Sequence, residues 1–224
     1  VNSSYTVSTV NDKTFPQHQH KYGAGYFGGS FINADLDGDG EDEKVVKTMD
    51  DASWGSKFDP SMEVIHWDAL YPEDDNYLNT RPWAAPSNTI EDFFRPATKA
   101  ENSISFSGGN QEGNFRFSYT NAANKGILPN SNSNKHNFSF NGSYDFTERL
   151  NVQANANYVN NRTTGRFGTG YDGRNVMQSF GQWFQTNVDF ARLEDYQSST
   201  GRQKTWNIAG PVSGNLRPIY FNNP

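Results

Sequence analysis

The sequence predicts an all-β fold made of antiparallel strands of a large transmembrane β-barrel, with about five strands present. Apolar and polar residues alternate with a period of two along several segments, which gives each strand one apolar and one polar face. The links between these segments alternate between short and long, as in outer-membrane barrels, whose short turns and long loops lie at opposite ends. A soluble antiparallel sheet whose aromatic residues pack on a core is the alternative that this pattern leaves open.

The strand pattern is weak at the N-terminus and strong in the middle of the chain. Residues 1–10 are expected to form barrel strand 1. Residues 100–121 are expected to form a hairpin of strands 2 and 3, and residues 135–160 a hairpin of strands 4 and 5. These four strands have about the 9–11 residues that cross an outer membrane. Asn141-Gly142 favours a two-residue hairpin turn, but the aromatic residues keep phase across it, so one unbroken strand is expected.

Residue parity assigns the side chains to the two faces. Aromatic residues gather near both ends of the apolar rows, as interfacial girdles do. Arg116 has the parity of the polar face, whereas on the lipid face near the bilayer midplane an arginine would cost about 2–4 kcal/mol. The residues expected to line the lumen are Arg116, Asn137, Ser139, Asn141, Asn151, Gln153, Asn155 and Asn157.

Three long connections are expected on the extracellular side. Residues 11–99 are too many for a structureless connector, so this loop is expected to fold as a lobe. The small core of the lobe is expected to include Trp54, Trp67 and Trp83. Residues 122–134 form the second extracellular loop. Residues 161–224 form the third, with a helix near 175–193, where apolar residues recur at near-helical spacing.

The acidic segment 35–43 has the spacing of the first part of an EF-hand-type calcium loop. Such a loop places side-chain oxygens at positions 1, 3 and 5, a glycine at 6, a backbone carbonyl at 7 and an acid at 9. The expected ligands are Asp35, Asp37, Asp39, Glu41 and Glu43. Position 12 is Val46, so the usual bidentate glutamate is missing. Structural calcium is therefore the expected cofactor, and a solvated acidic turn is the alternative.

Composition and motifs exclude several classes of function. No apolar run is long enough for a membrane-spanning helix, and the absence of cysteine excludes disulfides, thiolate zinc sites and a cysteine nucleophile. A net charge of -6 counts against nucleic acid as a partner. No G-x-S-x-G or H-E-x-x-H motif occurs, and His18 and His20 have no third metal ligand indicated. No enzymatic activity is expected.

Several runs resemble motifs of the SusC/RagA family of TonB-dependent outer-membrane transporters of Bacteroidota. These runs are Asp51–Asp59 (DASWGSKFD), Ser107–Asn121 (SGGNQEGNFRFSYTN), Lys125–Asn130 (KGILPN), Asn175–Gln185 (NVMQSFGQWFQ) and the ending Pro218–Pro224 (PIYFNNP). The acidic segment 35–43, followed by Val45 and Val46, is similar to an insertion in the first external loop of some members. The similarity covers nearly the whole chain, with the motifs in the same order.

The resemblance implies energised import of a bulky nutrient, an oligosaccharide or a peptide, across the bacterial outer membrane. Family members have an N-terminal plug, a 22-stranded barrel and a TonB-contacting segment, and by that comparison this chain starts after the plug and stops in the third external loop. The implied partners are a SusD-like surface lipoprotein, TonB through parts of the protein outside this chain, and outer-membrane lipid, in a dimer of transporter–lipoprotein pairs. Two alternatives stay open: a non-transporting outer-membrane barrel that anchors an assembly, and a soluble calcium-stabilised β-rich binding module.

Overall fold

The computed structural model describes residues 1–88 and 90–219. The fold is mostly β-structure with antiparallel sheets, which confirms the coarse fold class. The chain divides into two units: Val1–Asn11 with Phe94–Arg166, and Asp12–Phe93 with Phe167–Pro224. The two longest connections, 11–99 and 161–224, therefore contribute to one common unit. Residues 220–224, the greater part of the run Pro218–Pro224, lie outside the described part of the chain.

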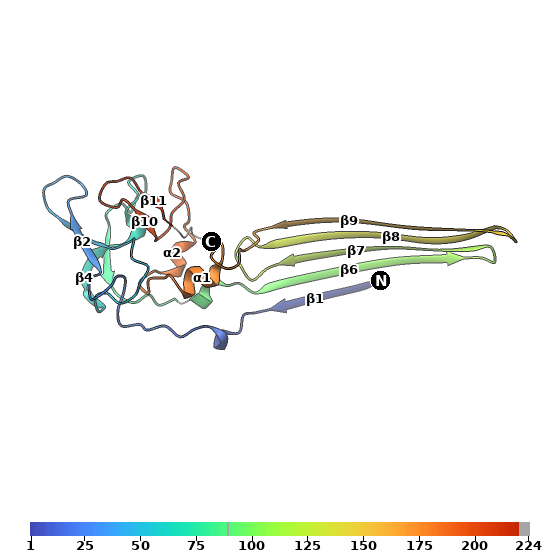
Figure 1. Cartoon of the computed structure of the whole chain (residues 1–224), viewed down its shortest axis with the longest axis horizontal. Helices are drawn as coiled ribbons and strands as arrows, with labels where there is room; N and C mark the ends of the chain where they lie inside the picture. The colour runs from blue at the N-terminus through green and yellow to red at the C-terminus, as the bar shows by residue number, and fades with distance from the viewer. Residues whose placement is uncertain (89, 220–224) are drawn as a thin grey trace. The chain divides into compact units, whose positions relative to one another are not determined.

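The first unit is a five-stranded antiparallel sheet in the order β1-β6-β7-β8-β9 (Figure 1). The strands are β1 (Asn2–Ser8), β6 (Ala97–Gly109), β7 (Gly113–Lys125), β8 (Asn132–Thr147) and β9 (Leu150–Thr164). Neighbours in the sheet are also neighbours along the chain once the insertion between β1 and β6 is set aside, so the sheet is a meander. The described strands leave this sheet open, with β1 and β9 at its edges, and they form no closed barrel.

The paired strands of this sheet are longer than the segments in which apolar and polar residues alternate. β8 runs unbroken through Asn141 and Gly142, which pair with Arg116 and Phe115 of β7. On the side of the long loops, β7 continues to Lys125 and β9 to Thr164, beyond the expected ranges. These ends carry no aromatic or large aliphatic side chain on either face, so the alternation of apolar and polar residues stops while the hydrogen-bonded ladder goes on.

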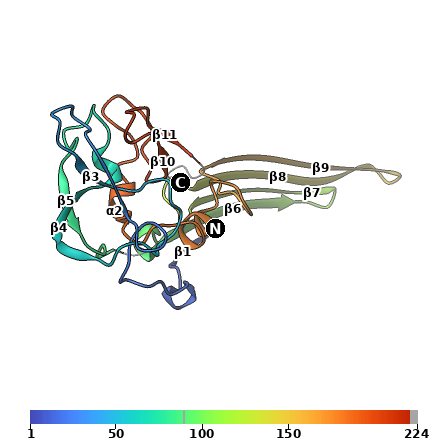
Figure 2. The same ribbon diagram turned by 60° about the vertical axis from the view of Figure 1, so that its left-hand side comes forward.

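The second unit contains a four-stranded sheet in the order β2-β3-β4-β5, of which Figure 2 labels β3, β4 and β5. Its strands are β2 (Phe31–Ala34), β3 (Glu43–Val46), β4 (Asp59–Ile65) and β5 (Thr80–Trp83). A two-stranded sheet pairs β10 (Ile208–Ala209) with β11 (Arg217–Pro218), and three short 3-10 helices are η1 (Asp12–Thr14), η2 (Trp67–Ala69) and η3 (Ile90–Phe93). The unit is thus an assembly of short elements from both long connections.

Two short helices, α1 (Val176–Gly181) and α2 (Phe190–Leu193), lie where one helix near 175–193 is expected. The aromatic residues of this segment pack inside the unit: the Phe180 ring centroid lies 4.9 Å from those of both Phe93 and Phe190. The first helix ends at Gly181, and Asp189 begins the second, its side chain accepting a hydrogen bond from the Ala191 N–H at 2.9 Å. The expectation of a helix is right, but the helix is not continuous.

Trp83 is the centre of the core of the four-stranded sheet. Its side chain is fully buried with Val46 and Val64, and its ring centroid lies 4.9 Å from that of Phe31 and 5.0 Å from that of Phe58. Trp67 is buried as expected. The expectation for Trp54 is wrong. Backbone hydrogen bonds tie its segment to Gly25 and Gly28, and the indole stays on the surface, 61% exposed.

Buried charges of the second unit are paired, as the low-dielectric interior requires. Asp68 is buried and binds the guanidinium groups of Arg81 and, at 2.8 Å, of Arg192. Lys204 is buried between Asp195 and Asp74, with its Nζ 2.9 Å from the Asp74 carboxylate. Burial alone lowers the pKa of Lys204, but the hydrogen bonds to Asp195 and Asp74 outweigh it and the pKa is raised. The pairs Asp68–Arg192 and Asp74–Lys204 join segments far apart in the sequence.

His66 makes the second unit sensitive to acid. The side chain is buried near Trp83, and its Nε2 has no hydrogen-bond partner among the described residues. Burial, helped by the charge of Arg81, lowers the pKa of His66 from 6.5 to about 4. As the pH falls, His66 takes up a proton in the unfolded state before it does so in the folded state, and this favours unfolding. The folded state therefore keeps its full stability above pH 6.5 and loses stability as the pH falls toward 4. We expect His66 to lower the free energy of unfolding by about 3 kcal/mol between pH 7 and pH 4, measured by urea denaturation.

The variant His66→Phe is the control, because phenylalanine fills the site without titrating. The pKa values of Glu73 and Asp74 are lowered, so these carboxyl groups also weaken the fold in acid, but they do so equally in both proteins. The difference between the two pH profiles therefore isolates His66. Parallel profiles would contradict the assignment.

Candidate functional site

The polar residues expected to line a lumen share one face of the five-stranded sheet. Arg116 pairs with Asn141, and Asn141 with Asn155, in a row that crosses β7, β8 and β9. Ser139 pairs with Asn157 in the next row. The rest of the set, Asn137, Asn151 and Gln153, has the same parity on the same strands. The structure thus brings all these side chains together on one surface, rich in neutral amides.

The opposite face carries a continuous band of apolar side chains. Phe117 pairs with Phe106 and with Phe140, and Tyr119 pairs with Phe138. Many of these rings face solvent: Phe106 is 56% exposed, Phe146 is 61% exposed and Tyr158 is 60% exposed. Within the first unit, the described residues contain no second layer that covers them. An exposed apolar surface of this kind marks a membrane or partner surface.

The height of this band is set by β8. Its aromatic residues extend from Phe138 to Phe146, which corresponds to about 27 Å at roughly 3.4 Å per residue. An outward-facing apolar band about 25 Å tall is typical of outer-membrane barrels. The aromatic part of β8 therefore has about the length of a tilted strand of the kind that crosses such a membrane.

The acidic loop connects β2 to β3, closed by the pairing of Ala34 with Glu43. One carboxylate oxygen each from Asp35, Asp37 and Asp39 lies within 4.8 Å of the others, and all three residues are exposed. The Asp35 carboxylate also accepts hydrogen bonds from the N–H groups of Gly38 at 2.6 Å and Gly40 at 3.0 Å. Both glycines have positive φ, 84° and 91°, which glycine adopts without strain.

The other two expected calcium ligands have different positions in this loop. Glu43 closes the base of the loop, its Oε2 accepting the Leu36 N–H at 2.7 Å. Glu41 is expected to offer a backbone carbonyl, and its side chain is not part of the aspartate cluster. Hard carboxylate oxygens on a glycine-containing loop are the ligands that calcium prefers. The cluster of three aspartates is therefore the part of the predicted site that the fold assembles.

A cavity of about 570 Å³ lies in the second unit. Its walls come from segments distant in sequence: 12–20, 86–88 with 90–91, and 180–190. Phe180, Phe184 and Phe190 supply apolar walls, and His18 and His20 supply polar ones. The aromatic spacing and the histidine pair are each visible in the sequence. Their meeting is a consequence of tertiary packing, and nothing in the sequence indicates it.

A comparison of the chain with protein-family models and with curated proteins finds no match. Among the described residues, no helix is long and apolar enough to cross a membrane. What the protein does must therefore be inferred from the sheet, the acidic loop and the cavity themselves.

Proposed function

We propose that this chain forms five neighbouring strands of a SusC-like outer-membrane transporter that imports a bulky nutrient, an oligosaccharide or a peptide. One observation carries the proposal: the five-stranded sheet has an exposed apolar band on one face, about as long as the strands that cross an outer membrane, and an amide-rich surface on the other. A soluble sheet covers its apolar face with protein, whereas a barrel wall turns it toward lipid.

The edges of the sheet support its continuation into a larger barrel. β9 is an edge strand of 15 residues, exposed along its whole length. The unpaired backbone groups of such an edge cannot be satisfied by lipid, and in water they promote aggregation. In the proposed arrangement, further strands pair with β1 and β9 and close the barrel.

The polar face then borders the aqueous interior of the transporter. Neutral amides suit this position because they hydrogen-bond to water and to sugar or peptide groups without a strong charge preference. Both long connections leave the same end of the strands, so the second unit is extracellular in this arrangement. A SusD-like lipoprotein binds there, force from TonB acts through parts of the protein outside this chain, and two transporter–lipoprotein pairs form a dimer.

Membrane insertion and uptake test this function. We expect the whole protein that contains this chain to require detergent, to float with lipid vesicles and to show heat-dependent gel migration. We also expect a deletion strain to lose uptake of labelled oligosaccharide or peptide, with recovery on complementation. A stable detergent-free monomer would favour the soluble binding module, and insertion without any uptake defect would favour the non-transporting anchor.

Calcium in the acidic loop is part of the proposed function, as a structural ion of the extracellular unit. We expect calcium to protect segment 30–50 from protease and chelator to remove that protection. The double variant Asp35→Asn/Asp37→Asn should lose the calcium effect. The control is Asp42→Asn, which removes a charge from the same loop at a position that supplies no ligand. Cleavage that is insensitive to calcium, with the unit still folded, would contradict the site.

A further inference from the structure

On the apolar face of the five-stranded sheet, a polar belt follows the aromatic band toward the long loops. The last aromatic row consists of Tyr119, Phe138 and Tyr158. One step further along the strands, the paired residues are Asn121, His136 and Asn160. Beyond them lie Asn134, Arg162 and Lys125. The face therefore changes from aromatic to polar and cationic within a few residues.

A groove of about 390 Å³ lies at this boundary, on β8 and β9. Phe138 and Tyr158, whose ring centroids are 6.2 Å apart, line its apolar part. Its polar part is lined by Asn134, His136, Asn160 and Arg162. The Tyr119 hydroxyl lies 2.8 Å from His136 Nδ1, which holds the imidazole in place and leaves Nε2 for a ligand. The groove thus combines an apolar wall with several hydrogen-bond donors.

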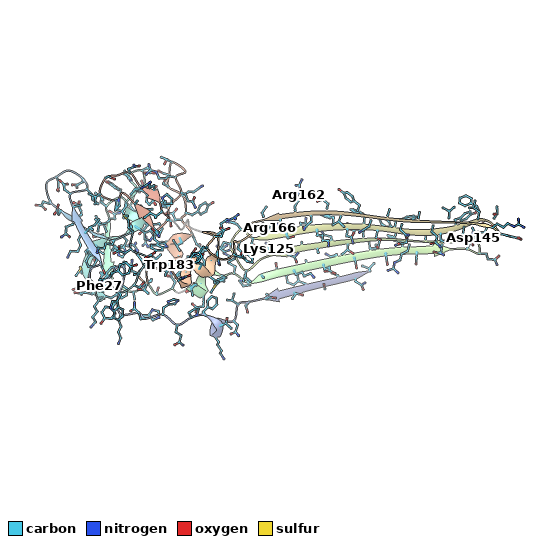
Figure 3. All side chains as sticks on the ribbon, in the orientation of Figure 1. Phe27, Lys125, Asp145, Arg162, Arg166 and Trp183 are labelled. Carbon is cyan, nitrogen blue, oxygen red and sulfur yellow. The ribbon has the colours of Figure 1, made fainter. Side chains whose placement is uncertain are left out.

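The charge of this face has one sign. Among the described strand residues, the apolar face of the five-stranded sheet carries no Asp or Glu. Lys125 and Arg162 both lie on this face. Figure 3 shows Lys125 and Arg162 at the end of the sheet opposite Asp145. Neither cation forms an ion pair with another residue of the described ranges 1–88 and 90–219. Their charge is therefore available to an external anion.

The polar face differs at the same end of the sheet. Lys99 and Lys135 lie there, and Lys99 is paired with Glu101 at 2.9 Å. Cations alone do not distinguish the two faces. The distinguishing feature of the apolar face is the combination of unpaired cations with an adjoining aromatic band.

We propose that this groove binds the phosphate-bearing headgroup of a membrane lipid whose acyl chains lie along the apolar band. The inference rests on the proposed membrane function, which places this row at the boundary between hydrocarbon and headgroups. The planar guanidinium of Arg162 matches phosphate oxygens in a bidentate geometry, and the neighbouring amides and imidazole donate to phosphate or sugar oxygens. A free anion would use the cations alone, whereas a lipid uses both parts of the groove.

Two double variants with the same change of charge test the proposal. Lys125→Gln/Arg162→Gln alters the apolar face, and Lys99→Gln/Lys135→Gln alters the polar face at the same end of the strands. The whole protein in detergent micelles is titrated with monophosphorylated lipid A, with its dephosphorylated form and with inorganic phosphate, and binding is measured by native mass spectrometry. We expect the first variant to bind the phosphorylated lipid at least about tenfold more weakly than the unmodified protein. The second variant should bind within about twofold of it.

Three outcomes would overturn the headgroup site. They are an equal loss of affinity in both double variants, equal binding of the phosphorylated and dephosphorylated lipids, and displacement of the lipid by inorganic phosphate at the same concentration. Vesicle flotation of the same preparations separates this result from the proposed function. Protein that inserts without discriminating between the lipids contradicts the site alone, and protein that does not insert contradicts the proposed function and the site together.

Discussion

Phe140→Arg is expected to destabilise the membrane-inserted protein by about 2–4 kcal/mol, the cost of an arginine on the lipid face near the midplane of a barrel. Phe140 lies within the apolar band of β8, paired with Phe117 on one side and with Ala156 on the other. No carboxylate has the parity of this face among the described strand residues, so the new cation would have no partner. It would have to reach the headgroups or draw water into the hydrocarbon.

The matched control, Ser139→Arg, changes the preceding residue of the same strand. Ser139 lies on the polar face between Ser118 and Asn157, where water would solvate the arginine. We expect this variant to cost less than about 0.5 kcal/mol, as surface substitutions usually do. Folding equilibria in lipid vesicles, read from the heat-dependent gel shift, give both values. Small, equal costs would mean that both faces are wet, and the reverse order would exchange the lipid and lumen faces.

Trp83→Ala is expected to destabilise the second unit by about 3–5 kcal/mol, the usual cost of removing a large aromatic side chain from a core. The indole is fully buried, its ring contacts Phe31 and Phe58, and its Nε1 donates a hydrogen bond to the Lys57 carbonyl at 3.1 Å. The cavity left by the substitution would be lined by core side chains of β2, β3 and β4. The paired strands around it hold their positions and cannot collapse into the space.

Trp54→Ala is the control, because it removes the same side chain from the surface of the same unit. The Trp54 ring contacts Tyr22, with centroids 5.0 Å apart, but is otherwise mostly exposed. We expect a loss of at most about 1 kcal/mol, in line with a single aromatic contact. Urea denaturation followed by near-ultraviolet circular dichroism reports the second unit. Similar losses for the two variants would contradict the assignment of Trp83 to the core.

The groove at the edge of the apolar band was not foreseen from the sequence. His136, Arg162 and Lys125 lie 11 to 37 positions apart along the chain, by the residue numbers, on strand ends that carry no alternation. Only the register of β7, β8 and β9 places them on one face at the same end of the sheet, with His136 and Arg162 in the groove itself. The same is true of Asp68 with Arg192 and of Lys204 with Asp74, which are buried pairs between the two long connections.

The sequence by itself determined the features that depend on near neighbours. These are the antiparallel β class, the two faces of the central strands, the unbroken course of β8 and the cluster of aspartates in one turn. A strand turns successive side chains to opposite sides, so the assignment to faces needs no knowledge of the rest of the chain. The tertiary structure alone decided which distant segments meet, which tryptophan is buried and how far each strand pairs. Those outcomes depend on contacts between residues far apart in sequence, and local periodicity carries no information about such contacts.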